Sequence, residues 1–214
     1  LAQLVAAPQL AWTPEENGKT KLSYARTSKY DNLLRYEGYE LILKILRYLY
    51  QIDAYISIAE VARERGFVFA EALPLGGNIL EIEGMFHPLI ENAIPNSIQA
   101  DAEHNVVFLT GANMAGKSTF MKTFGIVVYL AHMGFPLPVK KMRFSVQNGM
   151  YTTINLPDNM MLGYSHFYAE VQRLKKVAEQ VGRIGNLVIV FDELFRGTNV
   201  KDAHEATLAV MEAF

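Results

Sequence analysis

One loop pattern constrains this chain more than any other feature of its sequence. Residues 111–118 read Gly-Ala-Asn-Met-Ala-Gly-Lys-Ser, which fits the pattern G-x-x-x-x-G-K-[ST]. An apolar run at residues 106–109 precedes the loop, and a helical pattern begins at Lys117. Glycines let a backbone curl until several N–H groups point at one phosphate, and a following helix adds its positive end. The sequence therefore predicts a phosphate-binding loop between a buried strand and a helix.

The positions of this loop have separate predicted tasks. Lys117 would reach the outer phosphates of a nucleotide, and Ser118 would ligate Mg²⁺. ATP and Mg²⁺ are therefore the expected ligands. The alternative is a glycine-containing loop in which Gly-Lys-Ser stands by coincidence. The nucleotide-binding residues expected from the loop are Gly111, Ala112, Asn113, Met114, Ala115, Gly116, Lys117, Ser118 and Thr119.

A second apolar run, at residues 187–191, ends in two adjacent carboxylates, Asp192 and Glu193. Ligands bind beyond the carboxyl ends of strands in parallel sheets, so a buried strand would deliver both groups to one site. Asp192 would hold the Mg²⁺ shell, and Glu193 would position or deprotonate an attacking water. The pair favours hydrolysis over phosphoryl transfer to a substrate. The alternative is an acidic cap that follows a core strand.

The pattern along the chain divides it into two parts. Short apolar runs alternate with helical patterns after a glycine- and proline-rich boundary at residues 73–78, which indicates α/β architecture. Strands are expected at 79–83, 106–109 and 187–191, and helices near 117–132 and 167–181. We expect residues 1–72 to form a helical lever or connector, with 1–30 unassigned, and residues 73–214 to form the α/β domain.

The N-terminal part carries a long helical pattern at residues 31–65. Its apolar residues recur at alternating steps of three and four, which is a heptad seam. Two interpretations remain open: a long arm that faces a partner helix, or an amphipathic helix packed on a globular core. The seam consists of Ile42, Ile45, Leu49, Ile52, Ile56 and Ala59.

Composition excludes several kinds of site. The chain has no cysteine, so disulfides and cysteine zinc sites are ruled out. Its net charge of −2 shows no general basic footprint for nucleic acid. A local cluster of Lys140, Lys141 and Arg143 could touch DNA, although a solvated turn is the favoured interpretation. His204-Glu205 begins like a zinc-protease motif, but Leu208 stands where the second histidine would be required.

The ends and hydropathy of the chain lead to two further expectations. The chain starts at Leu1 and stops at Phe214 inside a helical pattern, so we expect a fragment of a longer protein. The longest apolar stretch, residues 126–131, is too short to span a bilayer, so a cytoplasmic location is expected. DNA would then be contacted mainly by parts outside this chain.

Several motifs in order resemble the MutS family of DNA-repair ATPases. Residues 110–119 are similar to the family's phosphate loop, in which an Asn-Met pair precedes Gly-Lys-Ser. Residues 192–199, Asp-Glu-Leu-Phe-Arg-Gly-Thr-Asn, resemble its Asp-Glu-(Ile/Leu)-Gly-Arg-Gly-Thr-Ser run. The resemblance covers residues 79–214. Further matches at the family's spacing are Asp158-Asn159, Ser165-His166-Phe167, Glu170, His87-Pro88 and Ile94-Pro95-Asn96.

The resemblance implies a P-loop NTPase with an ABC-ATPase-like sheet flanked by helices, preceded by the end of a helical arm. It implies a DNA-dependent ATPase of mismatch repair that forms a homodimer through composite ATP sites and works with repair partner proteins. Ser165 would reach the γ-phosphate bound by the other subunit, although a helix N-cap is the interpretation from sequence alone. Ile94 and Asn96 would contact the nucleotide.

The chain also departs from the family pattern. Phe195 replaces a glycine, Asn199 replaces a serine, and Ala93 stands where mismatch-sensing members carry an aromatic that stacks on adenine. An extra residue lies between Gly84 and His87. These differences leave two alternatives: a MutS-like paralogue that acts without mismatch recognition on other DNA structures or at a membrane, or a module that occludes nucleotide with little turnover.

Overall fold

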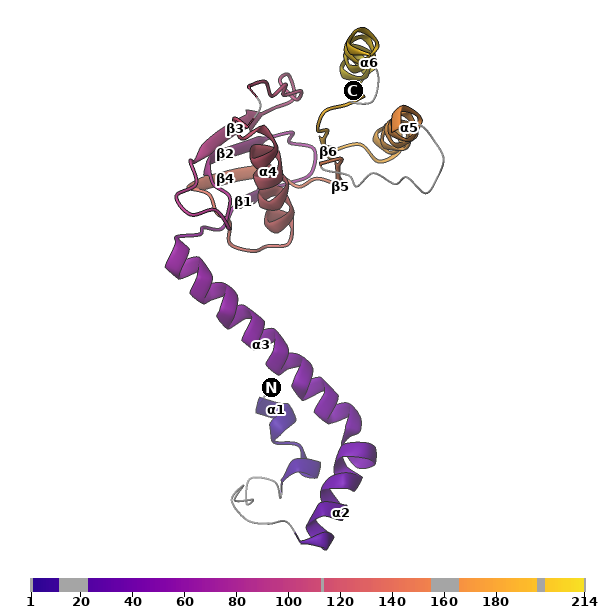
Figure 1. Ribbon diagram of the computed structural model, residues 1–214. Coiled ribbons are helices and arrows are strands. Elements are labelled where there is room, and N and C mark those ends of the chain that lie inside the picture. Colours follow the sequence, from indigo (N-terminus) through magenta and orange to yellow (C-terminus); the bar gives the residue numbers. More distant parts are fainter. Residues whose placement is uncertain (1, 12–22, 113, 155–165, 196–198, 214) are drawn as a thin grey trace. The chain divides into compact units, whose positions relative to one another are not determined.

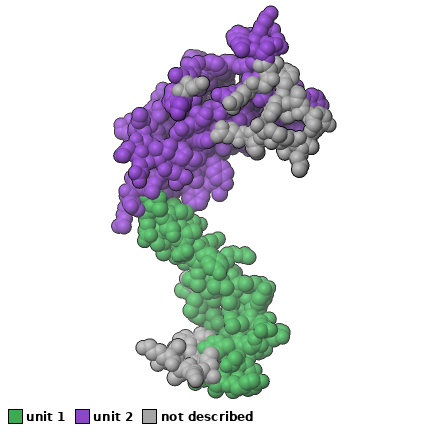
Figure 2. Space-filling model, viewed as in Figure 1, with its two compact units in different colours: residues 1–61 green, residues 62–214 purple. Residues whose placement is uncertain are grey.

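The computed structural model describes residues 2–11, 23–112, 114–154, 166–195 and 199–213. The chain is a mixed α/β protein with two compact units, Leu1–Val61 and Ala62–Phe214 (Figure 2). This division falls earlier than the expected boundary between residues 72 and 73. Residues just before that boundary belong to the second unit because Val68 pairs with Leu137 and the strand β1 (Glu71–Leu73) pairs with β4 (Lys141–Ser145).

The first unit is built from short helices followed by most of one long helix. Its elements are α1 (Ala2–Val5), η1 (Pro8–Leu10), α2 (Tyr24–Asn32), the π-helical turn η3 (Leu33–Glu37) and α3 (Tyr39–Arg65) up to Val61. Ser23 caps α2 by accepting a hydrogen bond from the N–H of Arg26 at 3.4 Å. The helical pattern predicted for residues 31–65 is therefore confirmed, with a π-helical turn near its beginning.

Helix α3 exposes the heptad seam that the sequence contains. None of its 27 residues, all of which the structure describes, is buried. The seam residues Leu49, Ile52 and Ile56 are 45%, 42% and 53% exposed. Among the described residues of the first unit, no core covers these side chains, and the role of α3 as an arm stays a prediction.

The second unit contains a four-stranded sheet in the order β1-β4-β2-β3 (Figure 1). Strand β1 is parallel to β4, while β2 (Leu80–Met85) is antiparallel to both β4 and β3 (Asn96–Ala100). The half-buried strand predicted at residues 79–83 is confirmed as β2. Helix α4 (Lys117–His132) crosses one face of this sheet, at the bounds that the helical pattern predicts.

A second sheet holds the other predicted strand. Strands β5 (Gly149–Thr152) and β6 (Leu187–Val190) form a parallel pair, and the helices α5 (His166–Ile184) and α6 (Val200–Ala213) follow β5 and β6 along the chain. The apolar run at 187–191 is therefore a strand, as predicted, although only Val190 of β6 is fully buried.

One core joins these elements. Side chains from β2, β4 and α4 form it, and Val190 of β6 belongs to the same cluster. Burying a valine, leucine, isoleucine, phenylalanine or methionine side chain contributes about 1.5–3 kcal/mol, so this cluster holds α4 firmly on the sheet. Its buried members are Ile82, Met85, Phe124, Val127, Val128, Ala131, Leu137, Val139, Met142, Phe144 and Val190.

A β-bulge in β2 lets two residues three positions apart face this core. Side chains alternate along a regular strand, so Ile82 and Met85 would point to opposite faces. The register shifts between them, and Gly84 adopts a φ of 63°, in the left-handed region that glycine tolerates. Ile82 and Met85 are consequently 2% and 1% exposed.

His132 ties the end of α4 to the chain after β4. Its Nδ1 lies 2.8 Å from the carbonyl oxygen of Val128, and its Nε2 accepts a hydrogen bond from the N–H of Gln147 at 2.9 Å. The ring also packs against Phe144, with the centroids 4.8 Å apart. This histidine has a structural role.

The buried strand predicted at residues 106–109 is wrong. Val106, Val107, Phe108 and Leu109 are 49%, 53%, 67% and 37% exposed, and the segment joins neither described sheet. An apolar run becomes a strand only where a neighbouring edge supplies hydrogen bonds. In the part of the chain that the structure describes, β6 pairs with β5 and no strand pairs with this segment.

The close approach of Gly77 to Ser145 gives a test of the sheet packing. A Cβ at Gly77 would lie 2.6 Å from Ser145 Oγ, which is fully buried and accepts a hydrogen bond from the N–H of Ile79 at 3.1 Å. Gly77→Ala should lower the free energy of unfolding by about 1–3 kcal/mol, measured by urea denaturation. Gly125→Ala is the control, because a Cβ there meets no atom within 4 Å.

A double-mutant cycle then separates the clash from other effects of the added methyl group. Ser145→Ala removes the obstructing oxygen, so the cost of Gly77→Ala should fall in that background. Equal costs in both backgrounds would show that the contact between the two residues does not limit position 77.

Candidate functional site

The glycine-rich loop curls around the amine of its own lysine. Lys117 is the first residue of α4, and its Nζ donates hydrogen bonds to the carbonyl oxygens of Gly111 at 2.7 Å and Ala112 at 2.9 Å. An ammonium group has three N–H donors, so these two contacts leave further capacity for an anion. The bonds hold the start of the loop beside the start of the helix.

Two residues with left-handed backbone angles contribute to this curl. Met114 has a φ of 65° and Gly116 a φ of 95°. Gly116 is the N-cap of α4 and has no side chain to bond the first N–H groups of the helix. The N–H groups of the first turn, at Lys117, Ser118 and Thr119, are thus the orphan donors of a helix N-terminus, where an anion is stabilised.

A pocket of about 380 Å³ opens beside the loop. Its lining combines residues of the loop with His87, Ile94 and Asn96, which belong to the two upstream motifs. Sequence reasoning missed Phe86, Ile90 and Phe120, which also line the pocket. Phe120 could have been found because it lies one helical turn after Gly116. The predicted site residues in the lining are Ile94, Asn96, Ala115, Gly116, Lys117 and Thr119.

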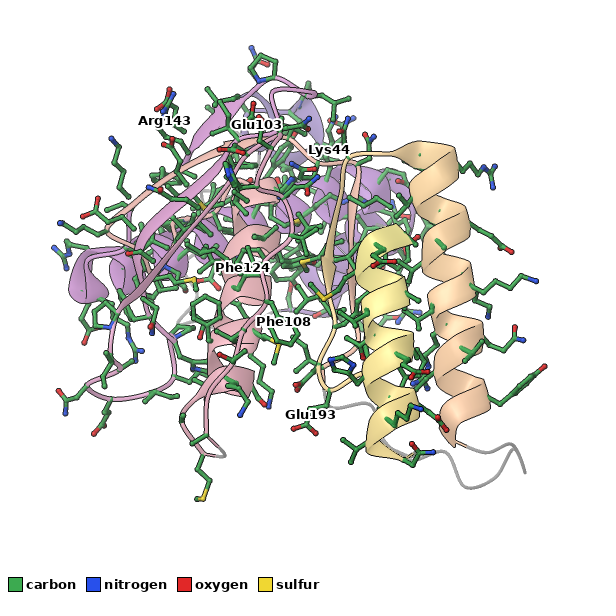
Figure 3. All side chains as sticks on the ribbon, turned by 90° about the horizontal axis from the view of Figure 1, so that it is seen from above. Lys44, Glu103, Phe108, Phe124, Arg143 and Glu193 are labelled. Atoms are coloured by element: carbon green, nitrogen blue, oxygen red, sulfur yellow. The ribbon has the colours of Figure 1, made fainter. Side chains whose placement is uncertain are left out.

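The pocket does not contain the two carboxylates. Asp192 and Glu193 follow β6 after one residue, and Val190 at the end of β6 packs in the core that also contains Phe124 of α4. Glu193 is exposed on the turn after β6, as Figure 3 shows. Among the described residues that line the pocket, neither carboxylate is found. The structure therefore connects the strand before them to the core that holds α4, but the described pocket lining does not bring them together with Lys117.

The turn after β6 carries unusual backbone angles. Glu193 has a φ of 47° and Phe195 a φ of 62°, both in the left-handed region. Phe195 is also 3% exposed. Glycine suits this conformation, whereas a phenylalanine there costs about 1–2 kcal/mol in backbone strain. Burial of the ring offsets that cost.

Several predicted site residues lie outside the described part of the chain. They are Asn113, Asp158, Asn159, Ser165, Arg196, Gly197 and Thr198. Ser118 is described as the second residue of α4 and is half-buried, but it does not line the pocket. Gly111 and Ala112 do not line the pocket, but their carbonyl oxygens accept hydrogen bonds from Lys117, which does.

The basic cluster is largely neutralised by neighbouring carboxylates. Arg143 forms ion pairs with Glu71 and Glu81, each at 3.1 Å. Lys140 bonds to Glu83, and this hydrogen bond lowers the pKa of the Glu83 carboxyl and raises the pKa of the Lys140 amine. The cluster is therefore a charge-paired surface of the sheet, and the favoured interpretation of a solvated turn is wrong for Lys141 and Arg143, which lie in β4.

No helix in the described part of the chain combines the length and the apolar character needed to cross a bilayer. No group of three or more histidine, aspartate or glutamate side chains in the described ranges could hold a metal ion.

Comparison with known proteins places this site in a family. The family described as MutS domain V matches residues 107–214, a span that contains the curled loop, Lys117 and the carboxylate pair. This chain belongs to the MutS family. The MutS resemblance of the sequence motifs is thereby confirmed.

Individual MutS relatives are similar along most of this chain. It is 32% identical to "DNA mismatch repair protein MutS" of Thermus aquaticus over 177 residues, which are 81% of this chain and 21% of that protein. It is 31% identical to "DNA mismatch repair protein MutS 1" of Halobacterium salinarum (strain ATCC 29341 / DSM 671 / R1) over 169 residues, 78% of this chain and 19% of that protein. The chain thus spans about a fifth of the length of the curated relatives it matches.

Because residue 195 has left-handed backbone angles, the alanine variant at this position should be less stable than the glycine variant, the reverse of the order in a regular helix. At position 195, alanine loses the buried ring and keeps the backbone strain, whereas glycine loses the ring and relieves the strain. Phe195→Gly should therefore be more stable than Phe195→Ala by about 1 kcal/mol in urea denaturation.

Phe124 of α4 is the matched control, because it is 9% exposed and lies in a regular helix. Glycine in a helix is less stable than alanine by about 0.5–1 kcal/mol, so Phe124→Ala should be the more stable variant there. The same order at both positions would contradict a left-handed residue 195.

Proposed function

We propose that this chain binds ATP with Mg²⁺ at the curled loop and hydrolyses the terminal phosphate bond. The observation that supports this most directly is the hydrogen bonding of Lys117 Nζ to two loop carbonyls beside a pocket. A lysine held at the start of a helix, among orphan N–H groups, suits the outer phosphates of a nucleotide. The family membership of residues 107–214 supports the same proposal.

The residues near the loop fit a magnesium–triphosphate complex. Mg²⁺ retains waters and takes one or two protein oxygens plus phosphate oxygens, so it needs no large protein cage. Ser118 and Asp192 would supply those two oxygens, and the bound ion would neutralise charge on the phosphates. Asp192 follows a strand whose last residue packs in the core with α4, the helix that carries Ser118.

Glu193 would act on the attacking water. A carboxylate can orient a water molecule and accept its proton while the phosphate bond breaks. Glu193 is exposed and directly follows the proposed Mg²⁺ ligand Asp192, a position from which its carboxylate would act on such a water. Ser165, on the other subunit of a homodimer, would add a donor to the γ-phosphate upon closure.

We further propose that ATP turnover in such a dimer changes the grip of attached arms on DNA in mismatch repair. The relatives are named DNA mismatch repair proteins, and this supports the assignment. The exposed apolar seam of α3 and the paired charges around Arg143 agree with an arm that transmits movement while other parts contact DNA.

A second candidate is a module that occludes nucleotide with little turnover. The observation that favours it is the absence of Asp192 and Glu193 from the described lining of the pocket. Phosphate release at steady state, with and without DNA, separates the two candidates. A rate indistinguishable from uncatalysed hydrolysis, together with tight ATP binding, would favour the occluding module.

Removal of the loop lysine tests the binding proposal. Lys117→Ala should abolish ATP binding, measured by isothermal titration calorimetry in the presence of Mg²⁺, because it removes the charge that faces the outer phosphates. Lys122→Ala is the control, since Lys122 is an exposed lysine on the same helix. Unchanged ATP affinity in Lys117→Ala would contradict the assignment of the loop.

Replacement of the second carboxylate tests the hydrolysis proposal. Glu193→Gln should keep ATP binding and slow phosphate release by about 10²-fold or more, the size of comparable catalytic deletions. Glu179→Gln, an exposed site on α5, is the control. A near-normal rate in Glu193→Gln would remove Glu193 as the group that activates water.

A further inference from the structure

Helix α3 ends in a closure that fixes the residue after it. The N–H of Phe67 donates a hydrogen bond to the carbonyl oxygen of Ala62 at 2.8 Å, and Gly66 between them has a φ of 67°. A left-handed glycine followed by such a bond is the Schellman motif of a helix C-terminus. Residues 62–65 of α3 belong to the second unit. Phe67 therefore has a set position relative to the last turn of the helix.

Two contacts join this helix end to the segment that follows β2. Arg65, the last residue of α3, donates a hydrogen bond from Nη1 to the carbonyl oxygen of Pro88. The ring of Phe67 packs edge-on against the ring of Phe86, with the centroids 5.9 Å apart and the planes at 64°. Phe86 and His87 both line the pocket beside the loop. The end of α3 thus contacts one wall of the pocket from behind.

A buried segment supports both sides of this junction. Val68 and Leu137 exchange backbone hydrogen bonds at 3.0 and 2.8 Å. The N–H of Phe86 donates to the carbonyl oxygen of Pro138 at 3.0 Å. Leu137 and Pro138 are both less than 2% exposed. Because Val68 and Phe86 share this support, the helix end and the pocket wall are connected through backbone hydrogen bonds as well as through side chains.

Pro88 makes the hydrogen bond of Arg65 effective on the pocket. A proline ring fixes its own φ and restricts the residue before it. His87 precedes Pro88, so a bond that holds the Pro88 carbonyl also restricts where His87 can lie. The structure describes Arg65 and Phe67, and neither of them lines the pocket itself. Both can act on a ligand only through Phe86 and His87, as positioning residues.

We infer that Arg65 and Phe67 hold residues 86–88 in place and so couple ligand binding in the pocket to the order of the last turn of α3, an inference that rests on the proposed nucleotide binding at the loop. The two states are the last turn held on the wall and the same turn opened, with the wall released. A ligand that contacts the wall binds the held state more tightly and shifts the population toward it. Coupling is reciprocal, so loss of the helix contacts weakens the ligand.

Hydrogen exchange at the helix end tests this coupling. The β,γ-imido analogue of ATP, which resists hydrolysis, is added with Mg²⁺ to the 214-residue chain. Deuterium uptake at residues 62–67 is followed by mass spectrometry. The ligand should slow exchange there by about fivefold or more, the lower end of the usual coupling between two sites.

Arg65→Ala tests the hydrogen bond to Pro88. The slowing of exchange by the ligand should shrink, and the Kd of the ligand, measured by calorimetry, should rise, each by about two- to tenfold, the net contribution of one hydrogen bond. Arg63→Ala is the matched control, because Arg63 is an exposed arginine in the same helical turn. It should bind the ligand and respond to it as the unaltered chain does.

Phe67→Leu tests the ring contact independently. Leucine keeps an apolar side chain but loses the edge-on contact with Phe86, so both measurements should change in the same direction by about two- to tenfold, the contribution of an aromatic pair. Phe69→Leu is the control, because Phe69 is 72% exposed and lies two residues further along the chain.

The outcomes separate failure of this inference from failure of the proposed function. A merely structural role would raise exchange at residues 62–67 equally with and without the ligand and leave its Kd unchanged, which would overturn the inference. Tight binding that leaves exchange at the helix end of the unaltered chain unaffected would also overturn it, while the nucleotide site stands. Absence of binding to the unaltered chain would overturn the proposed function and the inference together.

Discussion

Burial of one face of α4 against β2 and β4 is the interaction on which the rest of the described site depends. Val127 and Val128 are 0% and 2% exposed, and they share a core with Ile82 and Phe144. Because that face is fixed, the first turn of the helix is fixed as well. Gly116 then places the preceding loop, and Lys117 completes its curl through two loop carbonyls. The position of the curled loop is thus a consequence of apolar packing about three helical turns away.

The same helix links the loop to the carboxylates. Val190, the last residue of β6, belongs to the core that holds α4, and Asp192 and Glu193 follow it after one residue. The segments that carry the two halves of the proposed site therefore both adjoin one apolar core, although the described lining of the pocket contains only one half.

Local patterns predicted the helices well and the strands unevenly. The helical pattern that begins at Lys117 predicts the bounds of α4, because the backbone hydrogen bonds of a helix lie within its own segment. Strand β6 was predicted from the apolar run before Asp192 and is present. The similar run at residues 106–109 is exposed and unpaired among the described residues, since pairing depends on an edge far away in the sequence.

The sequence by itself determined the family, the loop with its lysine, the carboxylate pair and the presence of a long apolar seam, because these are contiguous patterns with local physical causes. Only the tertiary structure decided that Gly84 bulges β2, that Arg143 is paired with Glu71 and Glu81, and that Ile94 forms a wall of the pocket. Each of these joins segments distant in sequence, and the free energy of such contacts depends on packing that no local pattern records.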